Sequence, residues 1–69
     1  MIKILVYEAR IKEGLSLRKL SELTGISKSR LNNIENGKRS PTIEELEKIS
    51  KSTKTDFYDL LETNHEWDL

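Results

Sequence analysis

The sequence predicts an all-α fold in which five short helices form one domain. Its 69 residues are too few to build two hydrophobic cores. Apolar residues make up 35% of the chain and recur at helical spacing, so a disordered chain is a poor interpretation even though another 35% is charged. Glycine, serine, threonine and proline separate the helical stretches from one another.

The first part of the chain is predicted to form two helices. The first runs from Ile2 to Glu13 and ends at Gly14, which can adopt the left-handed conformation of a C-terminal cap. Residues 2–6 also have the composition of a strand, but the spacing of the apolar residues favours a helix. Ser16 is a good N-cap for the second helix.

A tight turn connects the second predicted helix to the third. It consists of residues 24–27 (Thr-Gly-Ile-Ser), in which Gly25 can take the positive φ that a sharp corner requires. Ser27 caps the third helix, which is predicted to run to Asn36 and Gly37. Two helices joined by a four-residue turn that contains glycine are typical of the helix-turn-helix motif.

Two more helices are predicted after a loop. The residue before Pro41 is pushed out of helical geometry, which ends the preceding element. Thr42 and Glu45 have the capping-box spacing that begins a fourth helix, and a fifth begins at Thr55 or Asp56. The apolar residues assigned to these helices are Ile43, Leu46, Ile49, Phe57, Leu60 and Leu61, of which the first three are predicted to face inward.

The domain is predicted to span residues 1–62 and to be followed by a short tail at residues 63–69. The tail contains His65, the one histidine of the chain, and a lone imidazole there is not expected to bind a metal. Trp67 is interpreted as a loosely docked aromatic rather than a stacking platform for bases, because its acidic neighbours repel phosphate.

The composition excludes several function classes. The chain has no cysteine, so it has no disulfide, thiolate zinc site or cysteine nucleophile. No apolar run approaches the ~18 residues that a membrane span needs, and no signal peptide is recognised, so a cytoplasmic location is expected. A core this small can hardly enclose a catalytic pocket, and no metal or cofactor is predicted.

Charge is segregated along the sequence although the net charge is zero. Residues 15–41 hold six basic side chains against two acidic ones, whereas residues 42–69 hold three lysines against eight acids. This distribution predicts a surface on one part of the molecule that binds a polyanion. Chance clustering on a solvated surface would explain the charges alone equally well.

The third helix is predicted to present one polar face. Leu31 and Ile34 define its buried side, and five polar residues without negative charge occupy the opposite sector. An asparagine amide matches the hydrogen-bonding groups of adenine in the major groove, and lysine can donate to guanine. An ordinary solvent-exposed face is the alternative, but the adjacent turn and the basic residues that follow favour DNA. The five residues are Lys28, Ser29, Asn32, Asn33 and Asn36.

The stretch from Leu15 to Lys38 resembles the lambda-repressor-like Xre/Cro helix-turn-helix family. The most specific pieces are residues 23–27 (Leu-Thr-Gly-Ile-Ser) and 34–38 (Ile-Glu-Asn-Gly-Lys), and the similarity extends over residues 2–61. The resemblance implies a five-helix lambda-repressor-like bundle whose third helix enters the major groove.

The resemblance also implies roles for individual residues. Arg10 and Glu35 occupy the positions of an ion pair that ties the first helix to the third. The residues at positions that contact bases are Lys28, Ser29, Asn32 and Asn33. The residues at positions that hold the DNA backbone are Ser16, Arg18, Ser27, Arg30, Asn36, Lys38, Arg39 and Ser40, in agreement with the preference of helix N-termini and basic side chains for phosphate.

The chain departs from the family pattern at a few positions. Leu17 replaces a glutamine that contacts the DNA backbone in many members, and Lys54 replaces the glycine that usually ends the fourth helix. Thr53 and Thr55 replace apolar residues, which predicts a loosely packed junction between the last two helices. No oligomerisation or ligand-sensing domain is recognised, so a stand-alone DNA-binding unit is expected.

The first helix has more apolar residues than one core-facing side needs. Ile4, Tyr7 and Ile11 are predicted to lie on its outer side, and such an exposed apolar stripe commonly marks a binding surface. It is a candidate interface for a homodimer or a protein partner. The alternative is that the tail folds back through Trp67 and covers it.

The predicted function is therefore that of a sequence-specific double-stranded DNA-binding transcriptional regulator, acting as a homodimer on a two-fold-related site. The competing prediction is a protein-interaction module of the same fold, such as the antitoxin half of a regulatory pair. An enzyme is the weakest of the three, because no nucleophile–base pair or carboxylate dyad is recognised.

Overall fold

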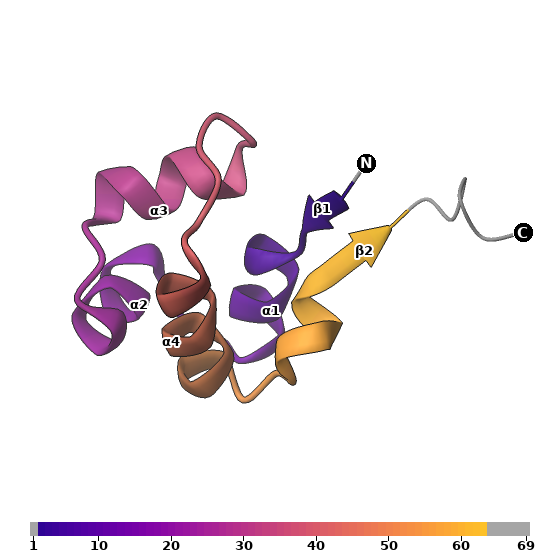
Figure 1. The fold of residues 1–69 in the computed structure, drawn as a ribbon. Coiled ribbons are helices and arrows are strands. Elements are labelled where there is room, and N and C mark those ends of the chain that lie inside the picture. Colours follow the sequence, from indigo (N-terminus) through magenta and orange to yellow (C-terminus); the bar gives the residue numbers. More distant parts are fainter. Residues whose placement is uncertain (1, 64–69) are drawn as a thin grey trace, which may run out of the picture.

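The computed structural model describes residues 2–63 of the chain (Figure 1). The helix-turn-helix lies at one end of the molecule and a small sheet at the other, with two helices between them. The elements in chain order are β1 (Ile2–Ile4), α1 (Val6–Lys12), α2 (Leu17–Thr24), α3 (Lys28–Glu35), α4 (Ile43–Thr53), the 3-10 helix η1 (Phe57–Leu60) and β2 (Leu61–Thr63). The fold of this part of the chain is mostly helical, but the predicted count of five helices is not confirmed.

The two ends of the described chain form an antiparallel sheet instead of helix. β1 pairs with β2 in a register that places Lys3 opposite Glu62, and the amide of Leu5 donates to the carbonyl of Leu60 at 2.7 Å. The first helix therefore begins at Val6, because residues 2–4 have strand composition and find a partner strand. The fifth predicted helix is only the single turn η1, and β2 continues to Thr63, one residue past the predicted domain boundary.

The hydrophobic core collects one or more side chains from every helix. Ile43 was predicted to face inward, and this is wrong, because 71% of its surface is exposed at the first position of α4. Leu46 and Ile49 are buried as predicted. The buried apolar residues are Val6, Ala9, Leu20, Ile26, Leu31, Ile34, Leu46, Ile49 and Leu60.

The predicted N-caps are confirmed. The hydroxyl of Ser16 accepts a hydrogen bond from the amide of Lys19 at 3.0 Å, and that of Ser27 accepts from the amide of Arg30 at 3.1 Å. Thr42 begins α4 with a complete capping box. These bonds satisfy amides that the first turn of a helix otherwise leaves without partners.

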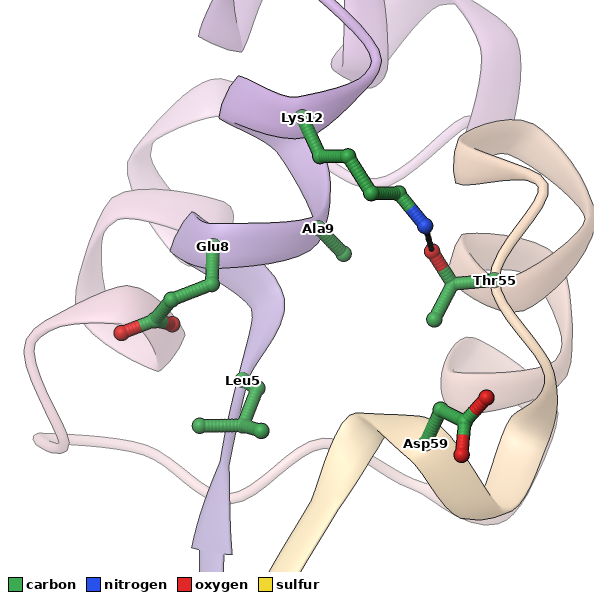
Figure 2. A pocket seen from close by; sticks show the side chains of 6 residues that line it. All are labelled: Leu5, Glu8, Ala9, Lys12, Thr55 and Asp59. Carbon is green, nitrogen blue, oxygen red and sulfur yellow. Dashed lines mark hydrogen bonds between the residues drawn. The ribbon is translucent and has the colours of Figure 1, made fainter.

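The junction between α4 and η1 is not loose, which corrects the prediction from sequence. Thr53 is fully buried and donates to the carbonyl of Ile49 at 2.7 Å. The hydroxyl of Thr55 donates to the carbonyl of Thr53 at 3.2 Å. It also accepts from Nζ of Lys12 at 2.9 Å (Figure 2). Because each buried hydroxyl has a hydrogen-bond partner, threonine packs there without the cost of an unsatisfied polar group.

Lys12 and Thr55 border a small hollow between α1 and the segment that leads into η1. Figure 2 shows Glu8 and Asp59 at its opposite edges. Within residues 2–63, the carboxylates form no group of three that could hold a metal ion. No helix of this part of the chain has both the length and the hydrophobicity needed to cross a membrane.

Lys54 ends α4 in the left-handed conformation, with φ 53° and ψ 38°. That conformation costs a residue with a Cβ roughly 1 kcal/mol relative to glycine. We expect Lys54→Gly to raise the free energy of unfolding in urea by about 0.5–1 kcal/mol, net of the greater entropy of the unfolded chain. The lost contact with Glu13, at 3.6 Å and with the lysine side chain 80% exposed, contributes little.

Lys54→Ala is the matched control for that substitution. It removes the same ammonium group but keeps a Cβ in the left-handed conformation, so we expect no gain in stability. A gain of equal size in both variants would show that the lysine charge, and not the backbone conformation, accounts for the difference.

Candidate nucleic-acid interface

Hydrogen bonds hold the turn between α2 and α3 in one conformation. Gly25 has φ 76°, as its predicted role requires. The hydroxyl of Thr24 donates to the carbonyl of Leu20 at 2.8 Å and accepts from the amide of Ile26 at 3.2 Å. Ser21 donates to the carbonyl of Ile26 at 2.6 Å, and the Ile26 side chain is buried in the core. The angle between α2 and α3 is therefore fixed by these hydrogen bonds within the turn and by the packing of Ile26 in the core.

The outer face of α3 carries the residues that the sequence assigned to base contacts. Lys28, Ser29 and Asn32 are exposed, and Asn33 is half-buried. Lys28, Ser29 and Asn32 border a shallow hollow together with Leu17 of α2. Two adjacent helices thus present hydrogen-bonding groups and one apolar side chain on the same surface.

The loop after α3 is tied to the helix by main-chain hydrogen bonds. The carbonyl of Asn33 accepts from the amides of Lys38 at 2.8 Å and Arg39 at 3.3 Å. Gly37 has φ 76°, which reverses the chain at the end of the helix. The side chains of Lys38, Arg39 and Ser40 are exposed. The positive charges of Lys38 and Arg39 therefore lie in solvent beside the C-terminal end of α3.

The start of α2 is the other predicted phosphate-contacting segment. Ser16 and Arg18 are exposed there. Arg18 approaches Glu22 at 3.7 Å, and with 84% and 58% of the two side chains exposed this pair constrains the arginine weakly. Asn36 is exposed and its amide donates to Asn32 at 3.4 Å, which joins the two side chains along α3.

Arg30 has an internal partner that the sequence analysis did not predict. Its guanidinium donates twice to the carboxylate of Glu45, at 2.6 and 2.8 Å, and once to the carbonyl of Ser40 at 3.4 Å. Glu45 also accepts from the amide of Thr42 at 2.9 Å. One carboxylate therefore joins α3, the loop and the start of α4. A contact of Arg30 with phosphate stays a prediction, and Glu45 competes for the same guanidinium.

The hydrogen bonds from Arg30 lower the pKa of Glu45 from 4.5 to about 2. Because the pKa is lowered on folding, the ionised carboxylate stabilises the protein above pH 4.5, and the contribution is lost as the pH falls toward 2. We expect wild type to be more stable than Glu45→Gln at pH 6 and the difference to shrink progressively below pH 4.5. Glutamine preserves the capping box, so urea titrations of the two proteins isolate the charge pairing. A difference that is constant from pH 6 to pH 2 would contradict this assignment.

Arg10 and Glu35 form the ion pair that the sequence predicted between the first and third helices. Nε of Arg10 lies 2.7 Å from one carboxylate oxygen and Nη2 lies 3.1 Å from the other, with 11% and 6% of the two side chains exposed. Nη1 donates to the carbonyl of Leu15 at 2.9 Å, and the ring of Tyr7 lies 5.3 Å from the guanidinium carbon. The hydrogen bonds to Glu35 raise the pKa of Arg10. The pair fixes the end of α3 against α1.

Two parts can be distinguished in the described residues. One is the α2–α3 unit, whose outer face is polar, and the other includes α1 and α4, which pack against that unit. Sequence profiles agree with this architecture: the helix-turn-helix family profile matches residues 6–60. The chain belongs to this family, and specifically to its lambda-repressor-like Xre type. It is thereby a DNA-binding transcription regulator by class, rather than a member of an enzyme family.

Solved structures of similar proteins have the same fold. The N-terminal DNA-binding domain of SinR from Bacillus subtilis is 35% identical, with 88% of this chain and 90% of that chain covered and a TM-score of 0.77. A complex of SinR with SinI gives 35% identity, a TM-score of 0.79 and coverage of 90% of this chain, which spans 61% of that chain. The restriction-modification controller protein C.AhdI from Aeromonas hydrophila is 25% identical, with 80% and 83% covered and a TM-score of 0.75. No curated protein has a sequence that matches this chain significantly.

Proposed function

We propose that this protein regulates transcription by binding a specific sequence of double-stranded DNA through the outer face of α3. The observation that carries the proposal is that Lys28, Ser29 and Asn32 are exposed together on a helix whose opposite side is locked into the core. Amide and hydroxyl groups can both donate and accept, so such a face suits the pattern of donors and acceptors in the major groove. With Asn33 these residues are proposed to contact bases.

Phosphates on both sides of the groove would be held by the two segments that flank α3. The first is the start of α2, where Ser16 and Arg18 lie beside main-chain amides. The second is the loop with Asn36, Lys38, Arg39 and Ser40, which the carbonyl of Asn33 ties to α3. Ser27, as the N-cap of α3, would add a contact at the edge of the groove. These phosphate contacts set the register of the protein on DNA, whereas the contacts with base edges determine which sequence is bound.

A salt titration of binding to a selected duplex tests this proposal. Arg39→Gln is expected to weaken binding to all duplexes alike and to reduce the slope of log affinity against log salt by about one unit. Lys51→Gln makes the same change of charge in the last turn of α4, outside the proposed interface, and is expected to leave the slope unchanged. Equal slopes for Arg39→Gln and wild type would remove the loop from the interface.

The protein is proposed to bind as a homodimer through the outer side of α1. Tyr7 and Ile11 support this, with 50% and 51% of their surfaces exposed. Ile4, the third residue of the predicted stripe, lies in β1 and packs partly against the core, so the apolar surface is smaller than predicted. A dimer that reads two half-sites must place its two α3 helices, one from each protomer, ~34 Å apart.

Sedimentation of Ile11→Lys, with and without duplex, tests the dimer. Ile43→Lys is the matched control, because Ile43 is 71% exposed on α4. We expect only Ile11→Lys to shift the association toward monomer. If both variants associate as wild type does, the interface lies elsewhere.

A protein partner is the second candidate function. It is favoured by the similarity to SinR, whose structure is known in complex with SinI. The same exposed residues on α1 would then bind another protein, as an antitoxin does in a regulatory pair. The cytoplasmic location and the stand-alone role expected from the sequence remain predictions.

A further inference from the structure

Leu17 is an apolar residue at the proposed DNA surface. It is the first helical residue of α2 and follows the N-cap Ser16, which is itself a proposed phosphate contact. The side chain is half-buried, with one part packed against the core. The exposed part of the leucine side chain can neither donate nor accept a hydrogen bond, so it cannot bind a phosphate or a polar base edge.

The exposed part of Leu17 lines a hollow with three residues of α3. Lys28, Ser29 and Asn32 border this hollow on the other side, and most of its lining is apolar. The same three residues are the exposed polar groups of α3 that are proposed to meet base edges. An apolar recess therefore opens within reach of bases, and its position is fixed because α2 and α3 are joined by the hydrogen-bonded turn.

The major groove offers one apolar group to such a recess. All four bases present hydrogen-bond donors or acceptors there, whereas thymine alone presents a methyl group, at C5. We propose that Leu17 and the hollow beside it form a thymine-methyl subsite, which makes Leu17 a specificity-determining residue. This inference rests on the proposed function, because it requires α3 to lie in the major groove.

The recess is too open to select a base alone, and its neighbours complete the selection. Lys28, Ser29 and Asn32 would hydrogen-bond the edges of the adjacent bases and hold the thymine methyl against Leu17. Each half-site would then require thymine at one position for its methyl group. A polar side chain at position 17 would remove that requirement without affecting the neighbouring bases.

Replacing thymine by deoxyuridine removes only the methyl group and tests the subsite on the unaltered protein. In a duplex selected from a random library, each thymine of a half-site is replaced in turn and the affinity is measured. At one position we expect uracil to weaken wild-type binding by about three- to fourfold, the effect of losing one buried methyl. Uracil outside the half-sites is expected to have no effect.

Three variants connect that loss to Leu17. Leu17→Gln is expected to bind thymine and uracil duplexes equally at this position, and Leu17→Met, which remains apolar, to retain the preference for thymine. Leu23→Gln is the matched control at the other end of α2, where 50% of the side chain is exposed, and it is expected to behave as wild type.

The proposal is overturned if no uracil substitution weakens wild-type binding, or if Leu17→Gln retains the wild-type preference for thymine. If no duplex is selected at all, the proposed function fails with the subsite. Selection of a defined site without methyl discrimination removes the subsite alone.

Discussion

Replacing Glu35 by alanine is expected to lower the free energy of unfolding by about 3 kcal/mol. The substitution leaves the guanidinium of Arg10 largely out of water, where it keeps the hydrogen bond to the carbonyl of Leu15 and the contact with the ring of Tyr7 but loses its countercharge. Removing one partner of a buried ion pair costs ~3–5 kcal/mol, because the other charge remains desolvated. The lower end applies here, since 11% of the Arg10 side chain is still exposed.

The exposed pair of Arg18 and Glu22 provides the control. Glu22→Ala also removes a glutamate that lies near an arginine, but both side chains of that pair are mostly in solvent. We expect a change within ~0.5 kcal/mol for this variant. Urea unfolding curves of both variants give the comparison, and similar losses in the two would mean that burial of Arg10 does not determine the cost.

Asn33→Ala is expected to weaken binding to the best duplex by ~1–3 kcal/mol and to relax the preference at one base of each half-site. Only the side-chain amide is removed. The carbonyl of Asn33, which holds the amides of Lys38 and Arg39, is part of the main chain and is retained. The loop should therefore keep its position, so that the loss reports the side chain's own contact with DNA.

Ser40→Ala is the control in the loop after α3. It removes a hydrogen-bonding side chain at an exposed residue proposed to hold the DNA backbone, so it is expected to weaken every duplex to a similar and smaller extent. The decisive measurement is the ratio of affinities for the best site and for a site altered at one base. An unchanged ratio for Asn33→Ala would exclude Asn33 from base recognition.

The features that the sequence predicted correctly depend on neighbouring residues. The N-caps Ser16 and Ser27, the capping box at Thr42 and the turn at Gly25 each involve residues within five positions of one another. Their side-chain chemistry determines the local backbone, so one stretch of sequence suffices to predict them.

The features that it missed depend on residues distant in the chain. Ile2–Ile4 is a strand only because Leu61–Thr63 pairs with it, and a three-residue strand has no periodicity of its own. Thr55 is buried, and its hydroxyl accepts a hydrogen bond from Lys12, which lies far away in the sequence on α1. The pairing of Arg30 with Glu45 joins α3 to α4, and no pattern within either helix indicates that these two side chains meet.

The candidate site divides in the same way. The outer face of α3 could be predicted because Leu31 and Ile34 mark the side that is buried. The hollow beside Leu17 could not be, because it forms only where the start of α2 meets α3 in space. A sequence pattern assigns residues to one face of a helix. To predict a recess between two helices, the angle and distance at which they cross must also be known.

Selection of bound duplexes from a random library tests whether α3 reads a specific sequence of bases, since it presupposes no target sequence. A protein that reads bases through α3 and acts as a homodimer is expected to enrich one motif made of two inverted half-sites, whose centres are about one helical turn, or a multiple of it, apart. The motif should lose information at one position of each half-site when the selection is repeated with Asn33→Ala. Recovery of duplexes with no sequence in common, at the affinity of the starting library, would show that α3 does not recognise a specific base sequence.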